Sequence, residues 1–417
     1  MARIEPFRAL RYTAAAGPLA DLIAPPYDVI DEPERARLAA SSPANAIHLE
    51  LPRGERPYET AAALLSRWQK DGWLAVDREP GVLLYAQTFA TERGSAERWG
   101  VLVALQLEPL DGGVVLPHER TLAAPKADRL SLIRACRTNL SPIFGMVDVP
   151  LDLAGQAVAA EPIASFEDRA GIGHRLWRLA EPTAVARLRD RIAAEQVFIA
   201  DGHHRYETAL AYRDERRAAD AAPGSKPYDF VLAYLCSTRD PGLVVLPTHR
   251  LLAGAPGDEE ILAPLRGKLA LESFTDPAAL ARAIASGPSP AGRPRVGLVR
   301  RGAAASWQIA VEPGSGGERG LAALPAPLRS LDVSLLHEVV LPGIAADRFS
   351  YTHDVREALA AVASGSAELA ALVPPPRVED VLAISRAGLT MPQKSTYFHP
   401  KVLTGLAFHR LDDGAER

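Results

Sequence analysis

The residues with the most evident chemistry lie in one short run, Asp201-Gly202-His203-His204-Arg205. Four apolar residues, 197–200, precede the run and are typical of a buried strand, and the residues that follow, up to 217, favour a helix. A chain that turns on Gly202 from a strand into a helix leaves unpaired N–H groups at the positive end of the helix dipole. Such a turn binds anions, and the planar guanidinium of Arg205 suits phosphate oxygens. The run therefore predicts a phosphate site, with a nucleotide as the expected ligand.

The two histidines of this run also allow a different interpretation, which is a metal site. His203 and His204 are adjacent, so their side chains diverge by roughly 100° at the start of a helix. Two metal ligands on one helical face are instead spaced i, i+4. We therefore expect phosphate contacts from this pair rather than metal ligation. A metal-dependent hydrolase stays open as an alternative function, and its candidate ligands are His118, His203, His204 and His249.

A second run, His118-Glu119-Arg120, places a carboxylate between two potential cations. A neighbouring positive charge keeps a carboxyl group ionised, which suits a general base or a Mg²⁺ ligand. In phosphoryl transfer the substrate hydroxyl loses a proton, and a carboxylate commonly accepts it. We predict Glu119 as this base, with Glu50 as the second candidate. The alternative is that Glu119 pairs with an arginine in a structural network.

The third run, 391–401, is rich in hydroxyl and amino groups and contains Pro392 and Pro400 near its ends. Only six of the 47 basic residues of the chain are lysines, and three of the six lie in such runs: Lys126, Lys394 and Lys401. Lysine is a compact point charge, unlike the arginine fork, so its use there indicates a need for an ammonium group. We predict that Lys394 contacts phosphate and neutralises developing charge. An ordinary loop that packs its aromatic residues into the core is the alternative.

Further polar residues are candidates to line the same cleft. Ser395 and Thr396 offer hydroxyl groups, and the full set expected to contact the substrate is His118, Arg120, Lys126, Ser395 and Thr396. Asn139 and Ser141 are additional candidates, although the sequence does not place them there. Tyr27 and Asp28 belong either to a substrate contact or to a proline-bounded turn.

The run 201–205 followed by a helix resembles the signature of the ParB/sulfiredoxin superfamily, which includes sulfiredoxins, CTP-binding ParB proteins and nucleotide-dependent free serine kinases. The resemblance implies that Gly202 forms the turn and that His203, His204 and Arg205 surround the nucleotide phosphates. It implies that Asp201 lies near the transferred phosphate or its metal ion. Sulfiredoxins carry their reactive cysteine where this chain has His203, so reduction of sulfinic acids is not expected.

A wider resemblance is to the bacterial and archaeal family named domain of unknown function 1015, whose motifs occur in order at 24–30, 118–121, 139–145 and 391–401. Together the two resemblances imply a phosphotransferase that uses ATP, ADP or CTP with Mg²⁺. Its acceptor would be a small hydroxyl metabolite, with free L-serine as the leading candidate. The alternative is a ParB-type switch that binds nucleotide and hydrolyses it slowly.

The composition of the chain narrows these functions. Its 417 residues are 47% hydrophobic and 24% charged, as in ordinary globular proteins, and the net charge of −4 argues against a general nucleic-acid partner. Cys136 and Cys236 are the two cysteines, so no disulfide framework is expected. No apolar run reaches membrane-spanning length and no signal peptide is evident. We expect a cytoplasmic protein whose partners are a nucleotide and a small substrate, and the oligomeric state stays open.

The elements that must position these residues alternate between strands and helices. Apolar runs predict a hairpin at 82–89 and 101–107 and a core strand at 230–236, and helical spacing predicts helices at 58–70, 126–137 and 182–194. Near the end, helices are expected at 355–363 and 368–372 and a strand at 380–385. We predict a mixed α/β fold: a ParB/sulfiredoxin-like nucleotide-binding core at 81–253, an N-terminal segment at 1–80, and a C-terminal segment at 254–417 that completes the site.

Overall fold

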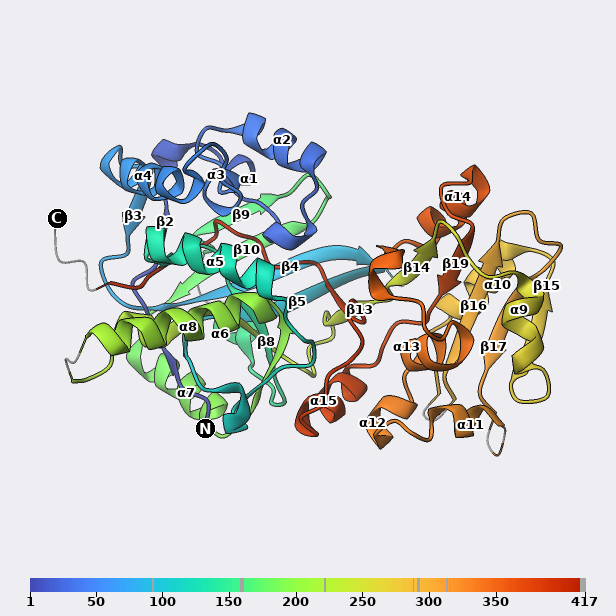
Figure 1. The fold of residues 1–417 in the computed structure, drawn as a ribbon. Helices are drawn as coiled ribbons and strands as arrows, with labels where there is room; N and C mark the ends of the chain where they lie inside the picture. Colours follow the sequence, from blue (N-terminus) through green and yellow to red (C-terminus); the bar gives the residue numbers. More distant parts are fainter. Residues whose placement is uncertain are drawn as a thin grey trace. The chain divides into compact units, whose positions relative to one another are not determined.

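The structure is a computed structural model that describes residues 1–417 except 92–93, 158–160, 221–222, 288, 291–292, 313, 315 and 413–417 (Figure 1). The chain forms two compact units. Unit 1 comprises Met1–Pro117, Thr121–Val244 and Pro400–Arg417, and unit 2 comprises His118–Arg120 and Val245–His399. The predicted mixed α/β fold is confirmed. The predicted segments 1–80, 81–253 and 254–417 stay predictions, and the last part of the chain, Pro400–Arg417, belongs to unit 1.

A mixed sheet forms the centre of unit 1, with strand order β6-β11-β8-β12-β5-β4-β10-β9 and with β1 paired to β5. The strands are β1 (Ile4–Glu5), β4 (Val82–Thr91), β5 (Gly94–Gln106), β6 (Val115–Leu116), β8 (Ile143–Val147), β9 (Ala164–Glu167), β10 (Gly173–Leu179), β11 (Val197–Asp201) and β12 (Phe230–Ser237). Strands β4 and β5 pair antiparallel, so the predicted hairpin is confirmed. Strand β11 runs parallel to β6 and antiparallel to β8, and its C-terminal residue, Asp201, lies opposite Phe144 of β8.

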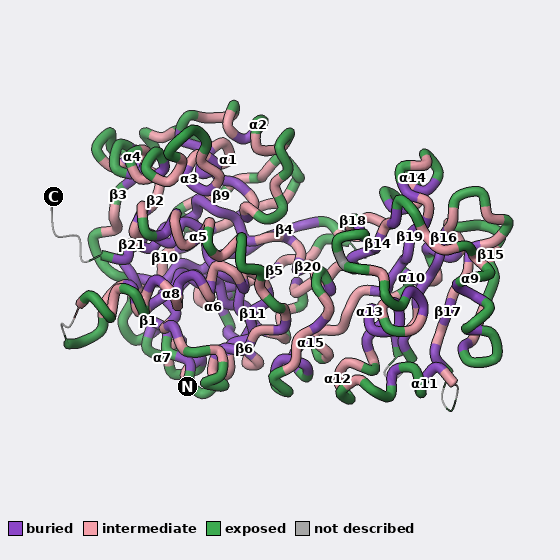
Figure 2. Tube along the Cα trace, in the orientation of Figure 1, coloured by how far each residue is buried: buried purple, intermediate pink, exposed green. Residues whose placement is uncertain are grey.

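Helices and small two-stranded sheets cover this central sheet. They are α1 (Leu19–Leu22), α2 (Glu32–Ser41), α3 (Ile47–Glu50), α4 (Pro57–Lys70), α5 (Ala123–Cys136), α6 (Leu153–Ala157), α7 (Pro182–Ala193) and α8 (His203–Ala219), with β2 (Leu10–Tyr12) paired to β3 (Leu74–Val76) and β7 (Thr138–Asn139) paired to β21 (His409–Arg410). Apolar residues of α7 and α8 pack with the strands of this sheet in one core cluster. Figure 2 shows the sheet strands as buried segments, and each fully buried Val or Leu contributes about 1.5–3 kcal/mol.

Unit 2 is built on a second, antiparallel sheet with strand order β15-β17-β16-β19-β14-β18. Its strands are β14 (His249–Leu252), β15 (Ala270–Phe274), β16 (Arg295–Arg300), β17 (Ser306–Ala310), β18 (Phe349–Thr352) and β19 (Leu369–Leu372), and its helices are α9 (Asp258–Leu262), α10 (Pro277–Ala285), α11 (Gly316–Leu321), α12 (Ala326–Arg329), α13 (Asp332–Leu335), α14 (Val355–Ser364) and α15 (Val378–Arg386). Helices α10 and α14 pack their apolar residues on this sheet. The strands β13 (Val244–Leu246) and β20 (Tyr397–His399) form a separate pair. Of the helices in the described residues, none combines the length and apolar character needed to cross a lipid bilayer.

Two elements near the end of the chain are the reverse of the sequence prediction. The predicted helix at 368–372 was wrong: Leu369–Leu372 forms β19, a fully buried strand between β16 and β14. Four apolar residues are too few for a helix to be told from a strand by periodicity, and sheet pairing decides. The predicted strand at 380–385 was also wrong, since it lies within α15. Acidic residues in the first turn and Arg386 in the last suit the dipole of this helix.

The residues from Pro400 onward bind along unit 1 by backbone pairing. Thr404 exchanges backbone hydrogen bonds with Ala24, Phe408 does so with Leu10, and β21 pairs with β7. His409 is buried in this tail, and its Nε2 lies 3.2 Å from the Pro227 carbonyl oxygen. Burial lowers the pKa of His409 to about 4, although the Pro227 carbonyl acts in the opposite direction. The tail is therefore anchored by a histidine that is neutral near pH 7.

This histidine makes the stability of the fold dependent on pH. Between about pH 4 and 6.5 the unfolded state binds the proton and the folded state does not, so stability falls as the pH is lowered through this window. The His409→Gln variant keeps a donor for the Pro227 carbonyl. When the pH is lowered from 7 to 4.5, we expect the free energy of unfolding of this variant to decrease by about 2–3 kcal/mol less than that of the wild type. Calorimetric melting at the two pH values measures the difference. Equal losses in the variant and the wild type would contradict the neutral state of His409.

Candidate functional site

The turn between β11 and α8 has the geometry that the sequence predicts. Ile199 lies opposite Gly145 and Asp201 opposite Phe144, so the strand bulges at Ala200 and re-aims the Asp201 side chain. Gly202 has φ +89° and ψ 29°, a left-handed conformation that other residues adopt with strain. Helix α8 begins at His203, with Gly202 as its N-cap residue. The turn therefore places the positive end of a long helix, and the N–H groups of its first turn, directly after Asp201.

Asp201 holds two cations at this turn, and we call the three residues Asp201, Arg205 and Lys401 the Asp201 cluster. The Oδ2 atom of Asp201 lies 2.7 Å from Arg205 Nη2, and its Oδ1 atom lies 3.0 Å from Lys401 Nζ. Burial would raise the pKa of the Asp201 carboxyl, but the charges of Lys401 and Arg205 outweigh it and hold this pKa well below its usual range. Two positive groups share one negative group, so the cluster has a positive charge to offer an anion.

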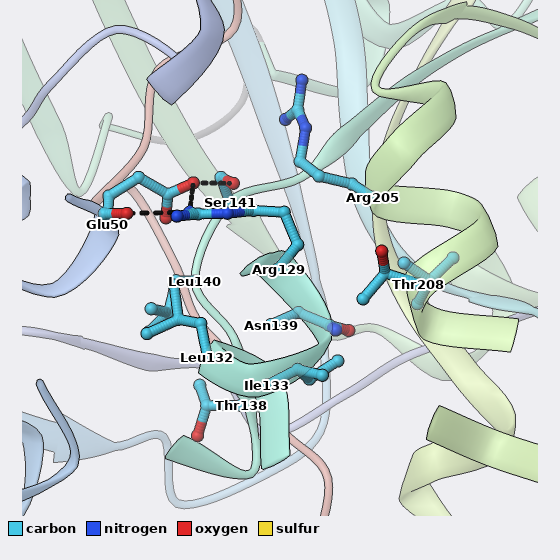
Figure 3. Close-up of a pocket in the computed structure, with 11 residues that line it drawn as sticks. Glu50, Arg129, Leu132, Ile133, Thr138, Asn139, Leu140, Ser141, Arg205 and Thr208 are labelled. Atoms are coloured by element: carbon cyan, nitrogen blue, oxygen red, sulfur yellow. Dashed lines mark hydrogen bonds and ion pairs between the residues drawn. The ribbon is translucent and has the colours of Figure 1, made fainter. Parts of the chain in front are cut away.

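A cavity of about 50 Å³ lies beside Arg205 within unit 1 (Figure 3). One water needs roughly 10–15 Å³ by this measure, so the cavity has room for a few waters or the polar end of a small metabolite. Its lining residues come from α3, α5, α8, β7, β12 and the chain around Ser141: Glu50, Arg129, Leu132, Ile133, Thr138, Asn139, Leu140, Ser141, Arg205, Thr208 and Val231. Asn139 and Ser141, which were candidates from the sequence, both line it.

Glu50 is the acidic residue of this cavity, and it is almost fully buried. Its Oε1 atom accepts a hydrogen bond of 3.0 Å from the Ser141 hydroxyl and lies 3.5 Å from Arg129 Nη1 (Figure 3). Among the described residues, three buried polar atoms that belong to the lining have no hydrogen-bond partner: Glu50 Oε2, Arg205 Nε and Thr208 Oγ1. Each such atom costs about 1–3 kcal/mol unless a guest satisfies it. All three atoms belong to residues that line the cavity, and each of them is shielded from solvent.

The motif at 24–30 also reaches this region. The guanidinium carbon of Arg129 lies 4.3 Å from the centre of the Tyr27 ring. Burial and the charge of Asp28 raise the pKa of Tyr27 to about 12, so its hydroxyl is protonated at neutral pH. Burial would lower the pKa of Arg205, but Asp201 and Asp28 raise it above its ordinary value. Tyr27 and Asp28 thus contribute to the electrostatics of Arg205.

Lys126 and His204, which the sequence predicts as ligand contacts, form hydrogen bonds with other parts of the protein. The Leu122 backbone N–H donates to His204 Nε2 at 2.9 Å, which ties the start of α5 to α8. Lys126 Nζ lies 2.8 Å from Glu207 Oε2, and the Thr121 hydroxyl donates to Glu207 Oε1. These two residues join α8 to the segment before it, and their predicted contacts with phosphate and substrate stay predictions. His203 is buried, and its charge contributes to the low pKa of Asp201.

The other predicted residues meet in unit 2. His118 Nε2 lies 2.9 Å from Thr396 Oγ1, and Arg120 Nε donates to Thr390 Oγ1 at 3.2 Å. Ser395 donates its hydroxyl to the Pro392 carbonyl. The two runs 118–120 and 391–399, far apart in sequence, therefore adjoin.

A fully buried arginine, Arg250, supports the second of these runs. Its Nη2 donates to the Lys394 carbonyl at 3.2 Å, and Lys394 has a left-handed φ of 56°. Burial lowers the pKa of Arg250 to about 10, while the charges of Tyr351 and Glu119 act in the opposite direction. The prediction that Glu119 and Lys394 act beside Asp201 stays a prediction, because they belong to unit 2 and Asp201 to unit 1.

Metal binding can be assessed from the same geometry. The described part of the chain contains no group of three or more His, Cys, Asp and Glu side chains placed to hold a metal ion. Magnesium in phosphoryl-transfer sites is typically held by one or two carboxylates together with the substrate phosphates. The residues that would hold such an ion are the exposed Asp28 and Asp201, whose carboxylates both act on Arg205 through their charges.

Sequence reasoning missed three contributors to this region: Arg129, Thr208 and the role of Lys401. Arg129 carried no signal, since arginine is the common cation of the chain. Thr208 is an unremarkable helix residue in the sequence. Lys401 had one signal, the scarcity of lysine, but its proximity to Lys394 in the same run left the assignment open.

The chain is similar to several known proteins. A family model described as "Protein of unknown function (DUF1015)" matches residues 4–334. No curated protein matches. Among solved structures, the chain is similar to a conserved hypothetical protein from Pyrococcus furiosus (15% identity, 73% of this chain and 92% of that chain covered, TM-score 0.36) and to a free serine kinase in complex with AMP (16%, 72% and 86%, 0.36). It is also similar to C-terminally truncated SbnI from Staphylococcus aureus (12%, 73% and 85%, 0.37).

Proposed function

This chain belongs to the DUF1015 family, and we propose that it is a nucleotide-dependent phosphotransferase that acts on a small hydroxyl metabolite. The observation that carries the proposal is the Asp201 cluster at the N-terminus of α8. Two cations, a left-handed glycine and a helix dipole converge there on one point. A nucleotide phosphate is the anion that this arrangement suits, and a cytoplasmic location follows from the use of such a substrate.

The phosphate end of the proposed site consists of Gly202, His203, His204, Arg205 and Lys401. The backbone N–H groups after Gly202 would donate to phosphate oxygens, and Arg205 would add its planar fork. Lys401 and Arg205 would neutralise the charge that develops on the transferred group. Asp201 would hold both cations in place and, with Asp28, bind Mg²⁺ that is itself bound to the phosphates. When bound, Mg²⁺ supplies charge neutralisation on the phosphate oxygens.

The acceptor end of the proposed site is the cavity beside Arg205. A ligand with a hydroxyl group directed to Glu50 Oε2 and a carboxylate directed to Arg205 Nε and Thr208 Oγ1 would satisfy all three unpartnered atoms. Free L-serine carries both groups and remains the leading acceptor. Because Glu50 lines the same cavity as Arg205, we favour it over Glu119 as the general base.

In the proposed reaction, the acceptor oxygen bonds to the terminal phosphorus of the nucleotide while the bond from that phosphorus to the bridging oxygen breaks. The acceptor proton passes to Glu50 Oε2, and the shortened nucleotide leaves with the electron pair of the broken bond. Ser141 and Arg129 keep the Glu50 carboxylate in place by their contacts with its Oε1 atom and backbone carbonyl.

Calorimetric titration with ATP, ADP and CTP, with Mg²⁺ and with or without L-serine, tests this proposal. In the Arg205→Ala variant we expect nucleotide affinity to fall by roughly 10- to 100-fold, because a charge-assisted hydrogen bond contributes about 1.5–3 kcal/mol. Arg213→Ala is the matched control, since Arg213 lies on the same helix and donates to the Leu107 carbonyl. Its affinity should equal that of the wild type.

Each outcome of the titration has a definite meaning. Nucleotide binding that depends on Arg205 and is strengthened by serine supports the kinase, and phosphoserine should then be detectable by NMR. Nucleotide binding that is indifferent to serine favours a ParB-type switch or another acceptor. A wild-type protein that binds none of the three nucleotides contradicts the proposal.

A further inference from the structure

A buried cation that the proposed reaction does not use lies in the β4–β5 hairpin of unit 1. Arg98 is fully buried, and on the neighbouring strand the residue directly opposite is Gln87, also fully buried. Arg98 Nη2 donates to Gln87 Oε1 and to the Pro400 carbonyl. Gln87 Nε2 donates to the Lys401 carbonyl at 3.0 Å. Arg98 and Gln87 therefore bind the backbone carbonyl groups of two successive residues, Pro400 and Lys401.

The same guanidinium also contacts the strand that faces Asp201. The guanidinium carbon of Arg98 lies 4.8 Å from the centre of the Phe144 ring and 5.6 Å from that of Tyr234. Phe144 on β8 is the residue opposite Asp201 on β11. One side chain thus links the backbone that carries Lys401 to the strand beside the carboxylate that Lys401 must reach.

A buried arginine is expensive to desolvate, so its use calls for a reason. An apolar residue at position 98 could fill the same space without the cost of desolvating a charge. The lysine side chain is long and has high rotamer entropy, so its ammonium stays beside Asp201 only if its backbone is fixed. Three residues further on, Thr404 exchanges backbone hydrogen bonds with Ala24.

We propose that Arg98 and Gln87 are positioning residues for Lys401. Their hydrogen bonds to the Pro400 and Lys401 carbonyls fix the backbone from which the ammonium group reaches Asp201. This inference deepens the proposed function and rests on it only for the consequence in catalysis, since the positioning itself is a property of the protein without ligand.

The test measures the reactivity of the Lys401 amine in the full-length protein without nucleotide. The chain has only six lysines, so competitive acetylation with acetic anhydride, followed by mass spectrometry, reports each one separately. In the Gln87→Glu variant the new carboxylate can still accept a hydrogen bond from Arg98. It has no N–H group to donate to the Lys401 carbonyl oxygen, so that hydrogen bond is replaced by a repulsive contact between two acceptors. We expect acetylation of Lys401 to increase about tenfold, because its amine is no longer held in contact with Asp201, while the other five lysines keep their rates.

Two further variants complete the test. Gln87→Met removes the donor without adding charge, so it tests the proposal if the Glu variant fails to fold, and we expect a smaller increase at Lys401. Gln69→Glu is the matched control, because Gln69 Nε2 also donates to a backbone carbonyl, that of Leu65 at 3.1 Å. It should leave Lys401 unchanged.

The result is independent of whether the protein is a kinase. A selective increase at Lys401 supports the positioning role even if no nucleotide binds, whereas unchanged Lys401 reactivity in both Gln87 variants overturns it. If phosphoryl transfer is measured, Gln87→Glu should lower kcat and leave KM for the acceptor within about twofold, as expected when charge neutralisation in the transition state is weakened.

Discussion

In the Asp201→Asn variant we expect turnover to fall by about two to three orders of magnitude, the usual effect of removing one preorganised electrostatic group. Asparagine keeps the shape of the side chain but leaves Arg205 and Lys401 without the carboxylate that holds them. The two cations then repel each other and lose their alignment toward the phosphate. Phosphate transfer from nucleotide to acceptor, followed by NMR, measures the effect, and a wild-type rate would rule out the site.

The same variant separates a lost role from a lost fold. Removing the anion of a buried ion group costs about 3–5 kcal/mol, so its melting temperature should decrease. Inorganic phosphate can replace the missing negative charge, and it should therefore raise the melting temperature of the variant more than that of the wild type. Asp214→Asn, a change on the exposed side of α8, is the control that should alter neither property.

Acidification does not reproduce this loss. Because the cations hold the pKa of Asp201 below its usual range, the carboxylate stays ionised well below pH 4, and the cluster is lost only as the pH falls through that low value.

The Glu50→Gln variant is expected to lose about 10²- to 10⁴-fold in kcat, the range typical of general-base catalysis. The amide oxygen can still accept from Ser141, so the cavity should keep its shape, while the site that accepts the proton is lost. Affinity for the nucleotide should remain within a few-fold, since Glu50 does not contact the phosphates in the proposed site. Steady-state kinetics and titration together separate the two effects.

Glu119→Gln provides the matched comparison, because the sequence favoured Glu119 as the base. If Glu50 is the base, the rising limb of the kcat–pH profile disappears in Glu50→Gln and persists in Glu119→Gln. The opposite pattern would assign the proton to Glu119, which lies in unit 2 near Arg250. A profile that both variants leave intact would contradict a carboxylate base.

The sequence predicted the phosphate turn and could not predict its partners. Gly202, between an apolar run and a helix, defines a local structure whose residues are adjacent in the chain, and the turn at Gly202 is as predicted. The Asp201–Lys401 contact joins residues 200 positions apart, and nothing local distinguishes Lys401 from Lys394. The cavity beside Arg205 assembles residues from 50 to 231 in the same way. Contacts of this length depend on the sheet order, which a single sequence does not determine.

The errors near the C-terminus have a related cause. The segments that form β19 and α15 are short, and their apolar residues fit either periodicity. In β19 the neighbouring strands β16 and β14 supply the hydrogen bonds that settle the question. The choice of the general base stays a proposal: the charge pattern of the sequence favours Glu119, and the burial of Glu50 beside Arg205 is the reason for proposing Glu50.

The insertion of unit 2 within unit 1 has a consequence for the entropy of the chain. The stretch Val245–His399 joins two parts of unit 1, so while it is folded it acts as a covalent cross-link of fixed span. If it unfolded, these residues would become a random coil with a preferred end-to-end distance of roughly 60–75 Å. Closing a loop of that length costs about 4–5 kcal/mol. Melting of the second unit alone would thus pull the terminal tail, and the lysine it carries, away from a carboxylate in the first.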